Sequence, residues 1–202
     1  MILYLHGFAS HGEGNKAKML REYFPNEKVV SPTLPVNPME AVDFIEKIYK
    51  SRPANERVVF VGTSLGGFYA YYFAALHDAP GAFINPSLEP WITLRDKVGI
   101  NKRHDTDEVF EWKEEYLGYL KELYDSIDRT EIYYRFLHFF ISLDDEVINH
   151  GKIIDLFPRH LIKFYDKMGH RFKDFSILLP EIKKIVEDPY RGDPGEFPDP
   201  DL

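Results

Sequence analysis

The stretch RVVFVGTSLGGFYAYYFAAL, residues 57–76, decides the fold of this chain. Its opening segment, Arg57–Val61, is dominated by Val and Phe without polar alternation, a pattern typical of a strand buried on both faces. Its closing segment, Leu65–Leu76, is apolar almost all round and predicts a buried helix. A buried strand followed at once by a buried helix is the repeating unit of a parallel sheet covered by helices.

Short apolar runs alternate with longer amphipathic or charged stretches on both sides of this unit. We expect strands at Met1–Leu5, Lys28–Ser31, Arg57–Val61, Ala82–Ile84, Arg135–Leu143 and His160–Tyr165. We expect further helices at 37–49, with Asn37 as N-cap, at Val147–Leu156 and at Phe172–Glu187. The predicted fold is therefore of the α/β class, a compact, mainly parallel sheet of about six strands with helices on both faces.

Two segments interrupt this alternation. Ser87–Arg129 is a long charged and aromatic insertion, and the pattern of Glu108–Leu123 predicts helices within it. We expect residues 87–129 to form a short helical cap over the carboxyl edge of the sheet, because the insertion leaves a strand at that edge. The tail, residues 188–202, contains four Pro, two Gly and five acidic residues and is expected to be disordered. The α/β domain itself is expected to span residues 1–187.

The composition argues against several classes of function. The chain has 202 residues with 25 Lys and Arg against 33 Asp and Glu, a net charge of −8 that disfavours binding to nucleic-acid phosphates or to an anionic membrane. The sequence has no cysteine, which excludes disulfides, thiolate metal ligands and a Cys nucleophile. The longest apolar run, Phe68–Leu76, is too short for a membrane span, and Met1–Leu5 lacks the basic segment of a signal peptide. We expect a single-domain cytoplasmic protein.

A G-x-S-x-G pentapeptide, Gly62–Gly66, lies between the predicted strand and the predicted helix. Such a pattern can be a merely structural turn, but its position immediately after a buried strand and before a helix is what a nucleophile elbow requires. The tight turn exposes the Ser64 hydroxyl above the sheet edge, where the helix N-terminus favours developing negative charge. The sequence therefore predicts Ser64 as a nucleophile.

A serine hydroxyl needs a general base and, behind it, a carboxylate. His170 follows the last predicted strand at the carboxyl edge, where the functional groups of a parallel sheet gather, and we predict it as the base. His6, after the first strand, is expected to be structural. Asp144 and Asp145 follow the preceding strand, and Asp145 is favoured because it is the first residue clear of that strand. Asp144 remains the alternative, and the acid that does not contact the histidine is expected to cap a helix.

Backbone donors and an apolar pocket complete the predicted site. The N–H groups of Phe8 and Leu65 are expected to bind the oxyanion that develops during acyl transfer. Trp91, Trp112 and Tyr116 of the insertion either line a substrate pocket or pack the insertion against the sheet. The sequence carries no His-x-x-x-His pair, and we expect neither a metal nor a cofactor.

These motifs resemble those of the α/β-hydrolase superfamily, which has the chain order Ser, Asp, His, and more narrowly those of the small YqiA-type esterases. The matching segments are His6-Gly7-Phe8 with Ser10, Lys16-Ala17, Gly62–Gly67, Ile84–Ser87, Asp145–Val147 and Gly169–Phe172. They span about residues 1–187. The chain departs from the branch at His11-Gly12 and at Met168, both beside the predicted pocket, which leaves the substrate preference open.

The resemblance implies hydrolysis of carboxylic esters or thioesters by Ser64, Asp145 and His170, with a small-molecule substrate. An acyltransferase would use the same acyl-enzyme with another acceptor. A non-catalytic ligand-binding protein would keep the fold without turnover. Because the insertion is short for a lid, we expect a shallow pocket that favours short or medium acyl chains.

Overall fold

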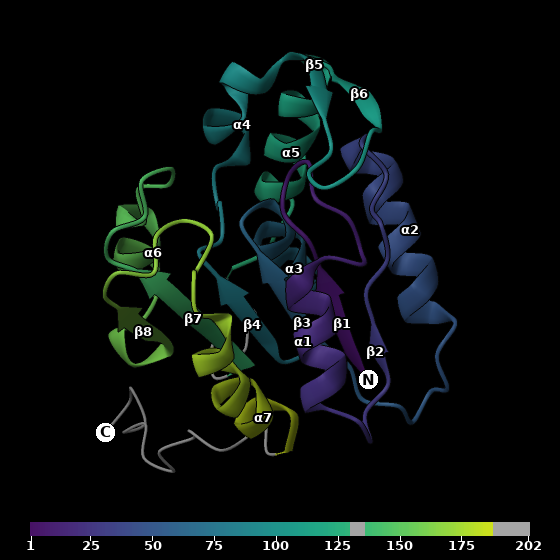
Figure 1. The fold of residues 1–202 in the computed structure, drawn as a ribbon, viewed down its shortest axis with the longest axis vertical. Coiled ribbons are helices and arrows are strands. Elements are labelled where there is room, and N and C mark those ends of the chain that lie inside the picture. Colours follow the sequence, from purple (N-terminus) through teal and green to yellow (C-terminus); the bar gives the residue numbers. More distant parts are fainter. Residues whose placement is uncertain (130–135, 188–202) are drawn as a thin grey trace.

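The computed structural model describes residues 1–129 and 136–187. Its centre is a sheet of six strands in the order β2-β1-β3-β4-β7-β8, and every neighbouring pair in it is parallel. Helices cover both of its faces (Figure 1). The predicted α/β architecture is confirmed.

The helices and strands alternate along the chain. In order they are β1 (Ile2–Leu5), α1 (Asn15–Tyr23), β2 (Val29–Val30), α2 (Pro38–Lys50), β3 (Val59–Thr63), α3 (Leu65–Leu76), β4 (Gly81–Ile84), α4 (Pro90–Thr93), β5 (Gly99–Lys102), β6 (Val109–Trp112), α5 (Glu115–Asp125), β7 (Leu137–Ser142), α6 (Gly151–Leu156), β8 (Ile162–Tyr165) and α7 (Leu179–Glu187). Short 3₁₀ turns lie at Arg95–Lys97, Arg159–Leu161 and Phe175–Leu178.

Two apolar layers hold the sheet between its helices, because alternate residues of each strand face opposite sides. On one side, Leu3 and Phe60 belong to the same buried cluster as residues of α2 and α3. On the other side, Tyr4 and Val61 pack in a cluster with residues of α1 and α7. Helix α3 is buried almost throughout, as its apolar sequence predicts. The layers fix the strands rigidly and thereby fix the loops at their carboxyl ends.

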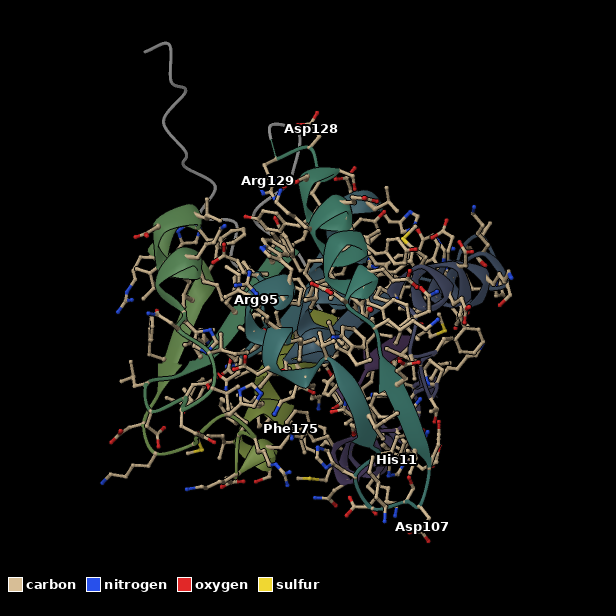
Figure 2. The ribbon with its side chains drawn as sticks, turned by 90° about the horizontal axis from the view of Figure 1, so that it is seen from above. His11, Arg95, Asp107, Asp128, Arg129 and Phe175 are labelled. Carbon is tan, nitrogen blue, oxygen red and sulfur yellow. The ribbon has the colours of Figure 1, made fainter. Side chains whose placement is uncertain are left out.

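The insertion at residues 87–129, which keeps the name cap below, contains helices α4 and α5 and a hairpin. The prediction of helices over Glu108–Leu123 is correct for α5 but wrong for β6, which pairs antiparallel with β5. Phe110 and Trp112 alternate with the more exposed Val109 and Glu111. Burial therefore repeats every two residues, as in a strand, and not with the period of a helix. Seen from above, the hairpin turn at Asp107 and the loop residue His11 lie on the same side of the molecule, and Asp128 and Arg129 lie on the opposite side (Figure 2).

Other boundaries differ by a few residues. Strand β3 starts two residues later than predicted and includes Gly62 and Thr63 of the pentapeptide. Helix α6 starts at Gly151 because the preceding loop folds around an aspartate, described below. The last helix starts at Leu179, after a 3₁₀ turn. Asp174 is the N-cap of that turn, and its side chain accepts a hydrogen bond from the N–H of Ser176.

Helix α1 is absent from the sequence prediction. Its N-cap is Gly14 without a capping side chain, and its first turn contains no acidic residue, so the usual start signals are missing. The predicted strand start at Arg135 and the predicted disordered tail at 188–202 lie outside the described residues. Within the described ranges, no helix is long and apolar enough to cross a lipid bilayer.

Candidate active site

Ser64 lies on a sharp turn between β3 and α3. Its backbone has φ +54° and ψ −120°, a conformation that a nucleophile elbow requires and that L-residues rarely adopt. A Cβ on Gly62 would lie 2.1 Å from the Gly66 carbonyl oxygen, and one on Gly66 would lie 2.0 Å from the Leu5 carbonyl oxygen. Only glycine fits at either position, so the pentapeptide is required by the close approach of β1, β3 and α3.

His170 lies in the loop after β8 and contacts both Ser64 and Asp145. Its Nε2 is 3.1 Å from Ser64 Oγ, and its Nδ1 is 3.0 Å from both carboxylate oxygens of Asp145. A carboxylate only accepts hydrogen bonds, so Nδ1 carries the proton and Nε2 is free to accept the serine proton. The structure brings together the three side chains that the sequence nominated from three separate strand ends.

Asp145 is held in a fixed orientation by its own loop. Its side chain is only 1% exposed. Its Oδ1 accepts hydrogen bonds from the N–H groups of Val147 and Ile148, each at 2.9 Å, and its Oδ2 accepts one from His150 Nε2 at 2.8 Å. Burial alone would raise the pKa of Asp145, but hydrogen bonds from the two histidines and from these backbone groups outweigh it and hold the pKa well below its ordinary value. The carboxylate is therefore ionised and oriented.

The two acids beside Asp145 hold the backbone of the histidine loop. Asp144 accepts hydrogen bonds from Ser142 Oγ and from the N–H of Gly169, at 2.6 and 3.0 Å, and these lower its pKa. Glu146 Oε2 accepts one from the N–H of His170 at 2.9 Å. Three consecutive acids thus contact three different groups of one loop, and Asp145 is the one that meets the imidazole.

Asn85, at the end of β4, fastens the same loop from the other side. Its Nδ2 donates to the carbonyls of Gly169 and His170, each at 3.0 Å, and its Oδ1 accepts from the N–H of Ser142 at 2.7 Å. Asn85 is fully buried, with φ +41°. Lys16 adds a hydrogen bond from Nζ to the Arg171 carbonyl at 2.7 Å. These contacts of Asn85 are not predicted from the sequence, although an asparagine directly after a buried strand is a usable signal for a polar group at the sheet edge.

The two residues expected to supply oxyanion donors, Phe8 and Leu65, belong to segments that lie next to Ser64. Leu65 is the first residue of α3, so its N–H has no acceptor within the helix. Gly7 packs directly on the serine: a Cβ there would lie 3.3 Å from Ser64 Cβ and 3.9 Å from Ser64 Oγ. The backbone of the next residue, Phe8, therefore passes close to the serine.

The cap clamps the loop that carries Phe8. Arg103 is 6% exposed and donates to the carbonyls of Ser10 and Leu34, at 2.6 and 3.0 Å, and the N–H of His104 donates to the Ala9 carbonyl. Arg103 Nε also pairs with a carboxylate of its own hairpin at 2.9 Å. The cap therefore contributes to the shape of the site through backbone positioning as well as through its aromatic side chains.

His6, at the end of β1, joins two loops rather than facing the serine. Its Nε2 accepts from the N–H of Leu34 at 3.0 Å, and its Nδ1 lies 2.9 Å from the Gly7 carbonyl. Burial lowers the pKa of His6 to about 4, so its ring is neutral at pH 7. These contacts with two loop segments fit the structural role that we expect for His6.

A small apolar cavity of about 30 Å³ lies beside Phe8 and Leu65. Its wall includes Trp112 of the cap, together with Leu34, Pro35, Val36, Tyr69 and Phe110. Trp91 lies outside this wall and packs on Tyr124, with ring centroids 5.1 Å apart. Tyr116 lies behind Trp112, at 5.2 Å between centroids. Of the three aromatics nominated for the pocket, Trp112 is the one that borders the cavity.

The site is built of a serine, a histidine and an aspartate without any cluster of metal ligands. No group of three or more His, Cys, Asp or Glu side chains within 1–129 and 136–187 is arranged to hold a metal ion.

The parallel sheet, the elbow after β3 and the polar loops after β7 and β8 define the α/β-hydrolase fold. Solved structures share it at low sequence identity. Est1E from Butyrivibrio proteoclasticus, with ferulic acid bound, superposes with a TM-score of 0.66 and 12% identity over 94% of this chain and 89% of its own. A structure from the metagenome-derived lipolytic enzymes LipS and LipT gives 0.63 and 15% identity over 92% of both chains.

The sequence itself places the chain in one family within this fold. Residues 1–187 match the family described as "Uncharacterised protein family (UPF0227)", and the chain belongs to that family. A UPF0227 protein of Yersinia pseudotuberculosis serotype O:1b is 29% identical over 194 residues, covering 91% of this chain and 97% of the relative. The resemblance to the α/β-hydrolase superfamily and its small YqiA-type members is confirmed.

Proposed function

We propose that this protein is a serine hydrolase that cleaves carboxylic esters or thioesters through an acyl-enzyme on Ser64. The observation that carries the proposal is the position of the His170 imidazole, with Nε2 at 3.1 Å from Ser64 Oγ and Nδ1 at 3.0 Å from Asp145. This is the hydrogen-bond chain that activates a serine hydroxyl. The lipolytic activity named for LipS and LipT supports the same class of reaction.

In the acylation step, Ser64 Oγ attacks the acyl carbon while its proton moves to His170 Nε2. The carbonyl oxygen becomes an oxyanion, which the N–H groups of Phe8 and Leu65 stabilise; each such donor contributes about 3 kcal/mol in serine proteases. Asp145 stabilises the imidazolium that forms. The C–O or C–S bond then breaks, and His170 returns the proton to the departing alcohol or thiol.

In the deacylation step, water takes the place of the leaving group. His170 Nε2 accepts a proton from the water as its oxygen attacks the acyl carbon, and the same two N–H groups bind the second oxyanion. Collapse of this intermediate releases the carboxylic acid and returns the proton to Ser64 Oγ. No cofactor takes part in either step.

We further propose that the acyl group is short. The cavity beside Phe8 and Leu65 measures about 30 Å³, far less than the roughly 300–1,000 Å³ of pockets that enclose larger ligands. We expect acetyl and propionyl groups to bind without movement of the wall and longer chains to require Trp112 or its neighbours to move.

The test is a series of p-nitrophenyl esters from acetate upward, together with acyl-CoA thioesters, on the parent and on Ser64→Ala. We expect hydrolysis to be fastest with the shortest esters. The alanine variant should lose at least about 10³-fold in kcat and should no longer react with a fluorophosphonate probe. Ser51→Ala, which removes an exposed hydroxyl at the opposite edge of the sheet, is the matched control and should react normally.

Three results would contradict the proposal. Equal labelling of Ser64→Ala and the parent would place the nucleophile elsewhere. Faster transfer of the acyl group to an added alcohol than to water would favour an acyltransferase. Failure of the folded parent to react with either the esters or the probe would favour a ligand-binding protein.

A further inference from the structure

Asp145 contacts two imidazoles, and only one of them faces the serine. His150 Nε2 lies 2.8 Å from Asp145 Oδ2, an oxygen that His170 Nδ1 also contacts at 3.0 Å. Both side chains are buried, with exposures of 6% for His150 and 1% for Asp145. The acylation and deacylation steps assign no part to this second histidine.

The direction of the His150 hydrogen bond follows from its partner. An ionised carboxylate only accepts, so His150 donates through Nε2–H. Its other ring nitrogen, Nδ1, is buried and has no hydrogen-bond partner in the part of the chain that the structure describes. An unpaired buried polar atom is unfavourable, and an apolar ring of similar size would avoid that cost. Packing alone therefore does not account for a histidine here, whereas donation to Asp145 does.

The backbone of His150 is rigid because it begins helix α6. Its carbonyl accepts hydrogen bonds from the N–H groups of Ile153 and Ile154, at 3.0 and 3.3 Å. The Asp145 carboxylate is consequently fixed by groups from its own loop and from the first turn of the following helix. Without the His150 donor, only the two loop N–H groups on Oδ1 and the His170 contact itself would hold the carboxylate in this orientation.

We infer that His150 is a positioning residue, which holds the Asp145 carboxylate in the orientation that His170 needs. The inference rests on the proposed function for its effect on rate. A carboxylate that turns away from His170 also stabilises the imidazolium less. Removal of the His150 donor should therefore change the pH dependence of the site as well as its geometry.

Other charged groups face the same loop and stay in place in the test. Asp144 and Glu146 bind backbone N–H groups of the histidine loop, as described above. Lys152 of α6 pairs with Glu89 of the cap at 2.6 Å. None of these contacts involves the His150 ring, so a change at position 150 leaves them intact.

The test compares two amides of different reach. In His150→Gln, the side-chain N–H₂ can occupy the place of imidazole Nε2 and donate to Asp145. In His150→Asn, the amide is too short to do so. We expect His150→Asn to lower kcat for p-nitrophenyl acetate roughly tenfold with KM changed less than twofold, an effect like that of orienting hydrogen bonds around metal-bound histidines. The acid limb of its kcat/KM profile should move downward by roughly half a pH unit, because a displaced carboxylate stabilises the His170 imidazolium less. His150→Gln should restore most of the rate and the parental pH profile.

A purely structural role predicts a different pattern. The two variants would then lose melting temperature and activity together, and the acid limb would stay where it is in the parent. That result would overturn the inference, as would parental kinetics in His150→Asn.

A second measurement separates this inference from the proposed function. The ring resonances of His170 can be followed by NMR as a function of pH in the parent and both variants, with no substrate present. A titration that moves to lower pH in His150→Asn but not in His150→Gln supports the positioning role even if the parent hydrolyses no ester. An unchanged titration in both variants overturns the role whatever the outcome of the ester assays.

Discussion

The two edges of the parallel sheet each carry a histidine paired with a carboxylate, and the edges differ in what else is nearby. At the carboxyl edge, His170 lies between Asp145 and Ser64. At the amino edge, His77 Nε2 bonds Glu46 at 2.8 Å, and its ring stacks on Tyr49 with centroids 3.9 Å apart. Besides its carboxylate, the histidine at the carboxyl edge thus contacts a hydroxyl, whereas the histidine at the amino edge contacts an aromatic ring.

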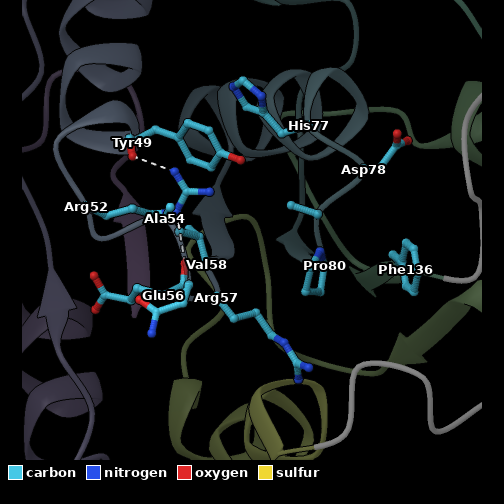
Figure 3. A pocket seen from close by; sticks show the side chains of 12 residues that line it. Tyr49, Arg52, Ala54, Glu56, Arg57, Val58, His77, Asp78, Pro80 and Phe136 are labelled. Carbon is cyan, nitrogen blue, oxygen red and sulfur yellow. Dashed lines mark hydrogen bonds between the residues drawn. The ribbon is translucent and has the colours of Figure 1, made fainter.

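The amino edge also has the larger cavity, about 250 Å³ against about 30 Å³ (Figure 3). The polar groups in the wall of this cavity stabilise the turn after α2. Arg52 donates to the carbonyls of Tyr49 and Glu56, and its guanidinium lies 3.7 Å from the centre of the Tyr49 ring. Neither the volume of a cavity nor a histidine–carboxylate pair therefore identifies an active site. The feature that distinguishes the carboxyl edge is a hydroxyl on a strained turn, that of Ser64, at 3.1 Å from the imidazole.

The largest expected difference between the edges comes from neutralising each acid. Asp145→Asn should lose about 10⁴-fold in kcat, the size of this effect in serine proteases, because an amide no longer fixes the His170 tautomer. Glu46→Gln, the matched change at the amino edge, should alter kcat less than twofold. Steady-state hydrolysis of p-nitrophenyl acetate measures both. A comparable loss in Glu46→Gln would remove the distinction between the edges.

The next largest effect on kcat distinguishes two neighbouring acids at the carboxyl edge, Asp144 and Asp145. Asp144→Asn weakens the contact with the N–H of Gly169 but leaves the imidazole bonded, so we expect a loss of roughly tenfold in kcat. The comparison with Asp145→Asn under the same assay decides which carboxylate serves the histidine. Equal losses, or a larger loss at Asp144, would reverse the assignment.

A smaller effect concerns the cavity wall. Trp112→Ala enlarges the cavity beside Phe8, so kcat/KM for butyrate and hexanoate esters should rise severalfold relative to acetate. Trp91→Ala removes a ring that packs on Tyr124 instead, and its chain-length profile should match the parent. If the profile is unchanged in both folded variants, the cap aromatics are structural and the acyl group binds elsewhere.

The last prediction concerns stability rather than rate, at His6, whose ring contacts backbone groups instead of a carboxylate. The pKa of His6 falls from 6.5 in the unfolded chain to about 4 in the fold, so the unfolded state binds more protons between these values. Stability contributed by neutral His6 is present above pH 6.5 and is lost as the pH falls toward 4. The free energy of unfolding in urea should drop about 2 kcal/mol less from pH 7 to pH 5 in His6→Gln than in the parent. Identical drops would show that His6 does not govern this pH range.

Local sequence predicted the parts of the molecule that depend on period and on turn chemistry. The buried strands and α3 follow from continuous apolar runs, and the elbow at Ser64 follows from its glycines. Helix α1 and the cap hairpin were missed because neither has a strong local signal: α1 lacks a side-chain cap, and the hairpin is rich in charge.

The candidate site likewise contains residues that local sequence predicts and contacts that it does not. Ser64, His170 and Asp145 could be nominated because each follows a recognisable strand. The contacts of Asn85, Glu146 and His150 could not, because they depend on how three loops fold back on one another after the sheet has formed.

The two contacts of His170 span very different lengths of chain. The bond to Asp145 joins residues 25 apart, within the consecutive unit β7-α6-β8, whereas the contact with Ser64 joins residues 106 apart and needs β3 and β4 in place. Closing the longer loop costs only about 1 kcal/mol more in chain entropy, but it requires the central strands to be docked first. The carboxylate–imidazole half can thus assemble locally while the nucleophile remains separate. During refolding, we expect the ability to react with a fluorophosphonate to return last, so this reagent reports on completion of the whole sheet.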